Sequence, residues 1–200
     1  MSLVNCKAPN FIASAVLENN KIINDFNFKN YINNKYAILF FWPMDFTFVC
    51  PSELIAFNNR FNEFKKRNVK LIGISLDSEF VHYAWRNTPI NEGGIGKVKY
   101  IMISDIKRKI QKIYDIEHPT LGVALRATFI INKERIIKTQ MVNDLPIGRN
   151  IDEIIRIIDA LQFHEKYGEV CPAQWKKGQP AIIPSSEGIK NFLNKNLNIL

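Results

Sequence analysis

The hydrophobic residues of this chain form short continuous runs, typical of buried strands, separated by segments with helical spacing. Residues 36–42 and 69–76 are almost uninterruptedly apolar, as in strands that are buried on both faces of a sheet. Between them, residues 53–66 carry leucine and phenylalanine at helical spacing, with Glu53 in the first turn and basic residues in the last. We therefore predict a strand–helix–strand unit whose helix begins near Cys50.

The middle of the chain continues this alternation. Ser78 is a candidate N-cap for a helix that runs to about Arg86 and ends before Pro89. Residues 126–131 and 135–142 flank a short polar turn, which is typical of a β-hairpin. Further segments predicted from the same pattern are a glycine-rich loop at 91–97, a strand at 98–103 and a helix at 107–114.

The C-terminal part has a different character. Asn150 has the position of an N-cap, and isoleucines follow it at helical spacing. After Gly168 the chain is rich in proline and glycine, and residues 186–196 have the pattern of a short helix. We expect an α/β domain in residues 1–165, with a central mixed sheet flanked by helices, and an extended C-terminal arm in residues 166–200.

Composition and charge narrow the possible partners. The 200 residues are 46% hydrophobic and 23% charged, as in a globular protein. The net charge is +8, but the lysines are dispersed and the sequence has no finger, KH or RNP pattern, so we expect no nucleic-acid partner. The longest apolar run has seven residues, too few to span a membrane, so we expect no membrane partner. The first residues lack a secretory signal pattern, and we expect a cytoplasmic protein.

Three cysteines, Cys6, Cys50 and Cys171, are too few for the disulfide framework of a secreted domain. No two of them have C-x-x-C spacing, and the three histidines show no zinc-ligand pattern. We expect no metal and no cofactor, and one or two reactive thiols in a reducing compartment. Cys6 matches no catalytic pattern and is interpreted as structural.

The setting of Cys50, in the stretch FFWPMDFTFVCPSELIAF at 40–57, favours a reactive thiol. Pro51 places Cys50 at or beside the N-cap of the following helix. The free N–H groups and the positive end of the helix dipole there favour an anion, and therefore the thiolate. Arg126, the hydroxyl of Thr47 and a backbone N–H are candidates to stabilise an oxygen that leaves during attack on a peroxide. The alternative is a small buried hydrophobic cysteine.

Several motifs occur along the chain in a fixed order. Pro43, Thr47 and Cys50 match P-x-x-x-[TS]-x-x-C, and EVCP at 169–172 is followed by Trp175. Four more segments accompany them: SLDS and HYAW within 75–85, GGIG at 93–96, LRATFII at 125–131 and DLPIGRNIDE at 144–153. Together these motifs resemble those of the typical 2-Cys peroxiredoxins, and the first is similar to the active-site signature of that family.

The resemblance covers about residues 8–180 and implies a thioredoxin-like fold with thiol-dependent peroxidase activity towards hydrogen peroxide and organic hydroperoxides. It implies that Cys50 is the peroxidatic nucleophile, which becomes a sulfenic acid. Thr47 is then expected to hydrogen-bond the peroxide and the thiolate. Pro43 is expected to shield the pocket from water, and Arg126 to stabilise the thiolate and the developing negative charge.

The resemblance also implies supporting residues and partners. Glu53 and Arg149 are expected to hold Arg126 in place. Cys171 is expected to resolve the sulfenic acid as a disulfide with Cys50 of another subunit, which a thioredoxin-like reductant then reduces. The implied assembly is a homodimer that assembles into a decamer. The position of Cys171 in the proline- and glycine-rich arm predicts an exposed, mobile thiol.

Two other functions are compatible with the same fold. A dithiol–disulfide oxidoreductase needs a second cysteine at the position of Glu53, where the chain has none. A holdase chaperone or structural ring needs no reactive thiol, so the change Cys50→Ser separates it from a peroxidase. We interpret His82, Trp85 and Trp175 as packing or hydrogen-bonded structural residues rather than as catalytic ones.

Overall fold

The computed structural model describes residues 2–199, and its chain forms two compact units. The first unit ends at Arg149 and the second begins at Asn150. The functional division at residues 165 and 166 stays a prediction.

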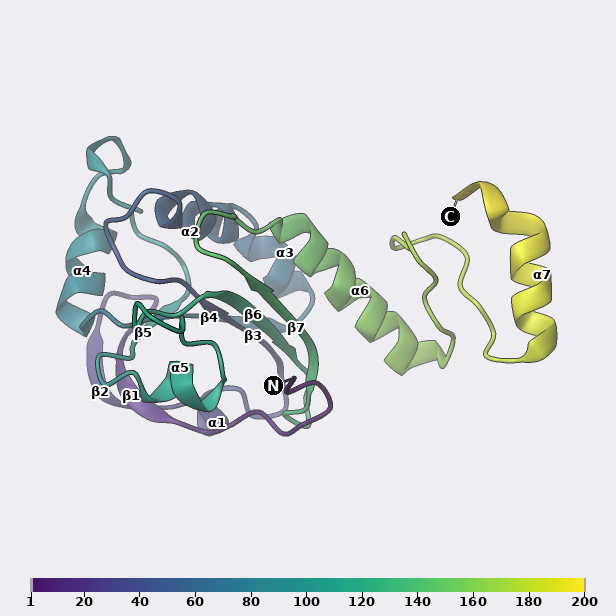
Figure 1. Ribbon diagram of the computed structural model, residues 1–200, viewed down its shortest axis with the longest axis horizontal. Helices are drawn as coiled ribbons and strands as arrows, with labels where there is room; N and C mark the ends of the chain where they lie inside the picture. The colour runs from purple at the N-terminus through teal and green to yellow at the C-terminus, as the bar shows by residue number, and fades with distance from the viewer. Residues whose placement is uncertain (1, 200) are drawn as a thin grey trace. The chain divides into compact units, whose positions relative to one another are not determined.

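The first unit is built on a mixed sheet whose strand order is β2-β1-β5-β4-β3-β6-β7 (Figure 1). The central strands β3, β4 and β5 run parallel, and the remaining neighbours pair antiparallel. The strands are β1 (Ile12–Val16), β2 (Ile22–Asn27), β3 (Tyr36–Phe41), β4 (Val69–Ser75), β5 (Ile101–Ser104), β6 (Arg126–Ile131) and β7 (Ile137–Asn143).

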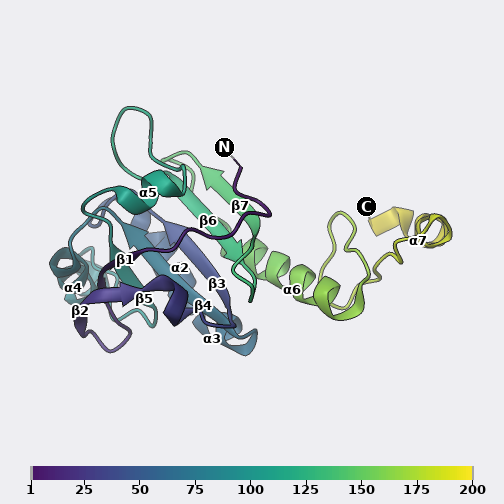
Figure 2. The same ribbon diagram turned by 90° about the horizontal axis from the view of Figure 1, so that it is seen from below.

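Helices cover both faces of this sheet (Figure 2). Alternate residues of β3 show this directly, because Phe40 stacks on Phe57 of α2 and Phe41 packs against Tyr114 beside α5. The helices of the first unit are α1 (Phe28–Tyr31), α2 (Cys50–Asn59), α3 (Phe61–Lys66), α4 (Glu79–Asn87) and α5 (Lys109–Ile113), with a short 3-10 helix η1 (Ile90–Glu92).

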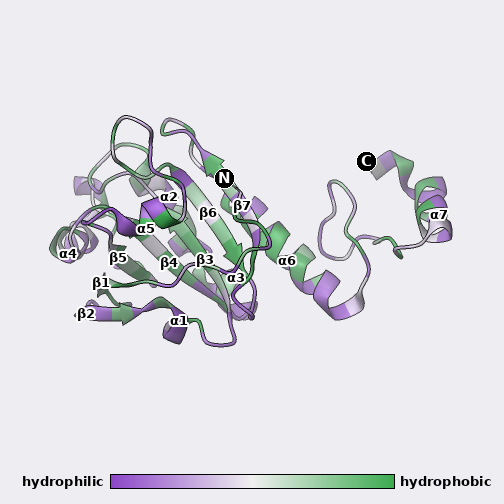
Figure 3. Ribbon diagram, turned by 60° about the horizontal axis from the view of Figure 1, so that its bottom comes forward, coloured by the Kyte–Doolittle hydropathy of each residue, from purple (hydrophilic) through white to green (hydrophobic). Residues whose placement is uncertain are grey.

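The core lies on the central strands, whose residues are largely hydrophobic (Figure 3). All six residues of β3 are buried, which confirms the sequence interpretation of 36–42 as a strand covered on both faces. The predicted hairpin is also confirmed, since β6 pairs antiparallel with β7. The N-cap prediction for α4 is correct, because the Ser78 side chain accepts a hydrogen bond from the Val81 N–H.

One predicted helix is wrong in extent. Residues 53–66 do not form a single helix, because α2 ends at Asn59 and α3 begins at Phe61. Residues of α2 accept hydrogen bonds from the segment just before β5. The Asn58 side chain accepts a hydrogen bond from the Lys99 N–H, and Tyr100 donates its hydroxyl hydrogen to the Leu54 carbonyl.

The second unit begins with α6 (Ile151–Tyr167), whose cap Asn150 accepts hydrogen bonds from two first-turn N–H groups, as predicted. Gly168 ends the helix in the left-handed conformation that glycine adopts at little cost. The following segment turns back, and Val170 pairs antiparallel with Ile182. It ends in α7 (Ser186–Asn196) and a 3-10 helix η2 (Leu197–Ile199).

Candidate active site

Cys50 is the first residue of α2, directly after the loop that leaves β3. The N-cap position is occupied by Val49, an apolar residue that has no side-chain group to bond the helix N–H groups. Pro51 follows in the first turn, where a missing N–H costs nothing. The Cys50 side chain is fully buried, so its sulfur is surrounded by protein atoms at the positive end of a helix.

Two polar groups converge on the Cys50 sulfur. The Thr47 hydroxyl oxygen lies 2.8 Å from it and the Arg126 Nη1 lies 3.3 Å from it. The Thr47 hydroxyl also lies 2.9 Å from the Met44 carbonyl, and its single hydrogen serves one acceptor at a time. The hydroxyl is therefore able to donate to a thiolate, or to donate to Met44 and accept from a thiol.

Arg126 is held from two sides. It is the first residue of β6 and is buried. Its Nη1 lies 2.8 Å from a carboxylate oxygen of Glu53, and its Nε donates to the Leu145 carbonyl at 2.6 Å. Glu53 stands three residues after Cys50 on α2, so one helix face presents both the sulfur and the carboxylate to the same guanidinium.

Arg149 binds the other side of Glu53. Its Nε and Nη2 lie 2.8 and 2.9 Å from the two carboxylate oxygens, and its backbone N–H donates to the same carboxylate at 2.9 Å. Arg149 Nη1 donates to the Ala127 carbonyl and the Thr128 hydroxyl. Such bidentate geometry fixes an arginine more firmly than a single hydrogen bond does.

The charges of this buried cluster do not cancel by themselves. Two guanidinium groups face one carboxylate, which leaves one positive charge for the Cys50 sulfur to balance. Burial opposes ionisation of Glu53, but Arg149 and Arg126 outweigh it and lower the pKa of the carboxyl. With the Cys50 sulfur as a thiolate, the side chains of Cys50, Glu53, Arg126 and Arg149 together carry no net charge.

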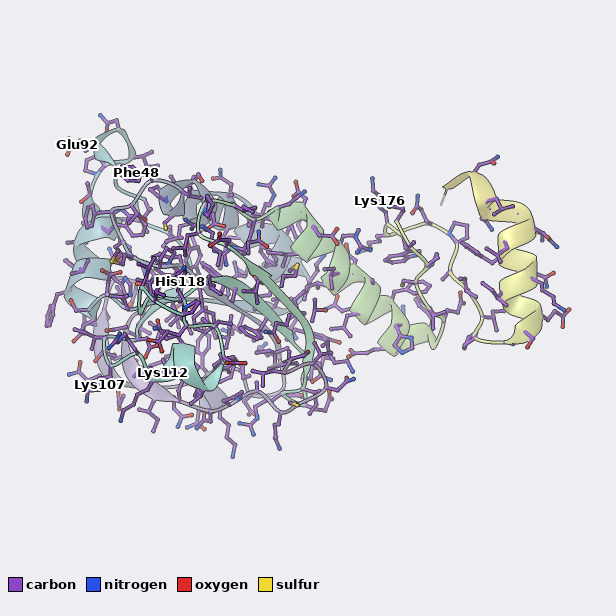
Figure 4. All side chains as sticks on the ribbon, viewed as in Figure 1. Phe48, Glu92, Lys107, Lys112, His118 and Lys176 are labelled. Carbon is purple, nitrogen blue, oxygen red and sulfur yellow. The ribbon has the colours of Figure 1, made fainter. Side chains whose placement is uncertain are left out.

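A pocket of about 790 Å³ adjoins the cluster. It reaches Pro43, Thr47 and Arg126, three of the predicted site residues. Phe48 on its wall is fully exposed at the molecular surface (Figure 4). Most of the other lining residues are apolar: Met44, Val49, Leu76, Ile106, Leu121, Val123, Leu145 and Pro146.

The other two cysteines lie apart from this cluster in the sequence and are free thiols. Cys171 belongs to the second unit, with its sulfur 3.7 Å from the Ala160 carbonyl of α6. The expectation of an exposed thiol is wrong, because Cys171 is partly buried where its segment turns back towards α6. Burial raises the pKa of this thiol, against the opposing effect of Arg156. Cys6 is exposed, and its carbonyl accepts a backbone hydrogen bond from Ile137.

The sequence interpretation missed Asp45. Its carboxylate is buried, 2.7 Å from Nδ1 of His82, and it accepts a hydrogen bond from Nε1 of Trp42. His82 is thus a buried histidine with both ring nitrogens hydrogen-bonded, in line with its interpretation as a structural residue. The indole N–H groups of Trp85 and Trp175 likewise donate to backbone carbonyls.

The described part of the chain contains neither a metal-ligand cluster nor a membrane-spanning helix. Among residues 2–199, no three His, Cys, Asp or Glu side chains are placed to hold a metal ion. Over the same residues, no helix combines the length and the apolar character that crossing a membrane requires.

Comparisons with known proteins agree with this geometry. The model of the AhpC/TSA family matches residues 4–140, and that of the C-terminal domain of 1-Cys peroxiredoxin matches residues 160–195. Alkyl hydroperoxide reductase C of Buchnera aphidicola subsp. Schizaphis graminum is 62% identical over 98% of both chains.

Solved structures give the same result. The reduced 2-Cys peroxiredoxin of Plasmodium vivax has a TM-score of 0.93 at 46% identity, covering 97% of this chain and 100% of that one. Thioredoxin peroxidase I of Plasmodium yoelii has a TM-score of 0.77 at 48% identity, covering 88% and 99%. The chain therefore has the thioredoxin-like peroxiredoxin fold, belongs to the AhpC/TSA family and is a thiol-dependent peroxidase.

Proposed function

We propose that this enzyme reduces hydrogen peroxide and organic hydroperoxides with Cys50 as its peroxidatic thiol. The observation that carries the proposal is the convergence of Thr47 and Arg126 on the Cys50 sulfur, at 2.8 and 3.3 Å. The same cation that favours the thiolate lines the pocket through which a peroxide arrives.

In the proposed reaction the Cys50 thiolate attacks the terminal oxygen of the peroxide. A sulfur–oxygen bond forms as the oxygen–oxygen bond breaks, which leaves a sulfenic acid and an alkoxide, or hydroxide from hydrogen peroxide. The leaving oxygen then takes up a proton from solvent. Thr47 hydrogen-bonds the peroxide, and Arg126 stabilises the negative charge as it moves from sulfur to the leaving oxygen.

The remaining site residues are assigned supporting roles. Glu53 and Arg149 hold Arg126 at the sulfur, a role supported by the bonds that both arginines make to Glu53. Pro43 is buried beside the pocket and limits access of water. The apolar pocket walls suit the alkyl groups of organic hydroperoxides as well as hydrogen peroxide.

We assign the resolving step to Cys171, carried by a C-terminal arm of residues 166–200. Its thiol condenses with the sulfenic acid of Cys50 in another subunit, and water leaves as the disulfide forms. A thioredoxin-like dithiol then reduces the disulfide, a proposal supported by the name of the Plasmodium yoelii relative. The proposed assembly is a homodimer that assembles into a decamer, in the cytoplasm and without a cofactor.

The test compares wild type with Cys50→Ser in rapid-mixing measurements of peroxide consumption. Wild type is expected to consume one equivalent of peroxide per subunit within the mixing experiment, and Cys50→Ser is expected to consume none. Equal consumption by both proteins contradicts the assignment of Cys50. A second assay, suppression of aggregation of an unfolded client, tests the chaperone alternative, for which Cys50→Ser makes no difference.

A further inference from the structure

Two adjacent residues of the loop between β3 and α2 are both held by α4. Asp45 contacts His82 at 2.7 Å, and Phe46 packs its ring 5.7 Å from that of Trp85. His82 and Trp85 stand three residues apart on α4 and therefore share one helix face. We call Asp45, Phe46, His82 and Trp85 the loop clamp.

The hydrogen bonds of the Asp45–His82 pair define where its proton lies. His82 Nε2 faces the Ile103 carbonyl at 3.1 Å and must carry a hydrogen there, so Nδ1 and the carboxyl share one further proton. Burial raises the pKa of Asp45, whereas Asp45 raises the pKa of His82 against the opposing effect of burial. Trp42 Nε1 occupies the other carboxyl oxygen at 2.8 Å. With this one shared proton, both carboxyl oxygens of Asp45 and both ring nitrogens of His82 have hydrogen-bond partners.

The backbone beside Asp45 is strained. Phe46 has a φ of 54°, in the left-handed region that is unfavourable for a non-glycine residue. Such a conformation persists where the surroundings hold it. Here the Asp45 N–H donates to Asp77 at 2.8 Å, and Asp77 also accepts from the Ser75 hydroxyl at the end of β4. The loop is thus fixed at Asp45 by its side chain and by its backbone.

Thr47 comes next in the chain after this strained residue. Its hydroxyl reaches the Cys50 sulfur because the loop turns at Phe46. Pro43 lies on the other side of the same segment, two residues before Asp45. We propose that Asp45 and His82 are positioning residues for peroxide reduction, which act by placing Thr47 and Pro43 against the Cys50 sulfur. This inference rests on the proposed role of Cys50.

The experiment uses Asp45→Asn and Asp45→Leu in the full-length enzyme. Asparagine keeps the bond to Trp42 and donates from its amide to His82 Nδ1, whereas leucine has the same size and no hydrogen bonds. The rate constant for Cys50 oxidation by hydrogen peroxide is measured beside the rate of alkylation by iodoacetamide. Alkylation reports the reactivity of the sulfur without requiring the Thr47 geometry.

Asp45→Leu is expected to lower the peroxide rate constant about 30-fold and the alkylation rate less than about threefold, because misplaced groups penalise only the oriented reaction. Asp45→Asn is expected to keep the peroxide rate constant within about threefold of wild type. If Asp45→Leu does not fold, Trp42→Phe removes one bond to Asp45 and keeps an aromatic ring at this buried position, and a loss of about threefold to tenfold in the peroxide rate alone is expected.

Tyr114→Phe is the matched control, since it removes a buried hydrogen bond to the Pro9 carbonyl elsewhere in the same unit. Its peroxide rate is expected to equal that of wild type. The inference is overturned if Asp45→Leu reacts with peroxide at the wild-type rate. It is also overturned if the peroxide rate and the alkylation rate of Asp45→Leu fall by the same factor, or if the peroxide rate of Asp45→Asn falls as far as that of Asp45→Leu. If wild type and Cys50→Ser react with peroxide at equal rates, the proposed function is wrong, and the positioning role of the loop clamp is wrong with it.

Discussion

At the scale of single residues, the site depends on one carboxylate. Glu53 binds both Arg126 and Arg149 and lies one helical turn from the Cys50 sulfur, which Arg126 contacts. A buried ion pair is costly to break, because removal of one partner leaves an unpaired buried charge. Glu53 therefore contributes to stability as well as to the orientation of Arg126.

Glu53→Gln is expected to lower the free energy of unfolding at pH 7 by about 3–5 kcal/mol. Because the folded protein lowers the pKa of Glu53, its stabilising contribution is present above the ordinary carboxyl value of 4.5 and is lost as the pH falls below it. The wild-type free energy of unfolding should therefore decline more between pH 5 and pH 3 than that of Glu53→Gln. Urea denaturation across this range measures both quantities.

Glu92→Gln is the control for this measurement, because Glu92 is exposed on the loop after α4 (Figure 4). It is expected to change the free energy of unfolding by less than about 0.5 kcal/mol. Equal free energies for wild type and Glu53→Gln at pH 7 contradict a structural role for the buried carboxylate.

The sequence was informative about residues whose neighbours are close in the chain. Pro51 beside Cys50 indicated a helix start, and Glu53 was placed in the first turn of that helix. Asp45 was missed because its partner His82 is 37 residues away and neither residue type is unusual in its own segment. Only the folded chain brings such a pair together.

At the scale of elements, the strongest sequence signals were continuous apolar runs and helix caps. They correctly placed β3, β4 and the start of α6. The hairpin of β1 and β2 was not predicted, because β2 reads IINDFN, without regular alternation, and only one of its six residues is buried. The break between α2 and α3 was not predicted, and it lies beside contacts of Asn58 and Leu54 with the segment before β5, which no local pattern contains.

Tyr100→Phe tests how much the contact with α2 contributes. It removes the hydroxyl that donates to the Leu54 carbonyl at 2.9 Å and keeps the ring against Phe40. The free energy of unfolding is expected to fall by about 1 kcal/mol, the usual net value of one buried hydrogen bond. Urea midpoints of Tyr100→Phe and of the exposed control Tyr83→Phe provide the comparison. A midpoint for Tyr100→Phe equal to that of the control speaks against the contact.

At the scale of the whole molecule, the two units divide the proposed work. The first contains the cluster around Cys50 and the pocket, and the second contains Cys171. The Cys171 thiol is partly buried and burial raises its pKa, which fits its proposed role as the resolving thiol rather than as the first nucleophile.

Cys171→Ser is expected to consume one equivalent of peroxide per subunit and then stop, because the sulfenic acid no longer becomes a disulfide that thioredoxin reduces. Wild type treated with peroxide should run as a covalent dimer on a non-reducing gel, and Cys171→Ser as a monomer. Cys6→Ser is the control, expected to form the dimer like wild type. An oxidised wild type that runs as a monomer contradicts a disulfide between subunits.

The unequal numbers of guanidinium and carboxylate groups beside Cys50 have a consequence for the order of events. In the proposed reaction the thiolate becomes an uncharged sulfenic acid, and the anion that neutralised the surplus cation is then gone. The surplus cation therefore attracts the oxidised side chain less than it attracted the thiolate. Oxidation thus weakens the electrostatic hold on Cys50 before a second thiol arrives.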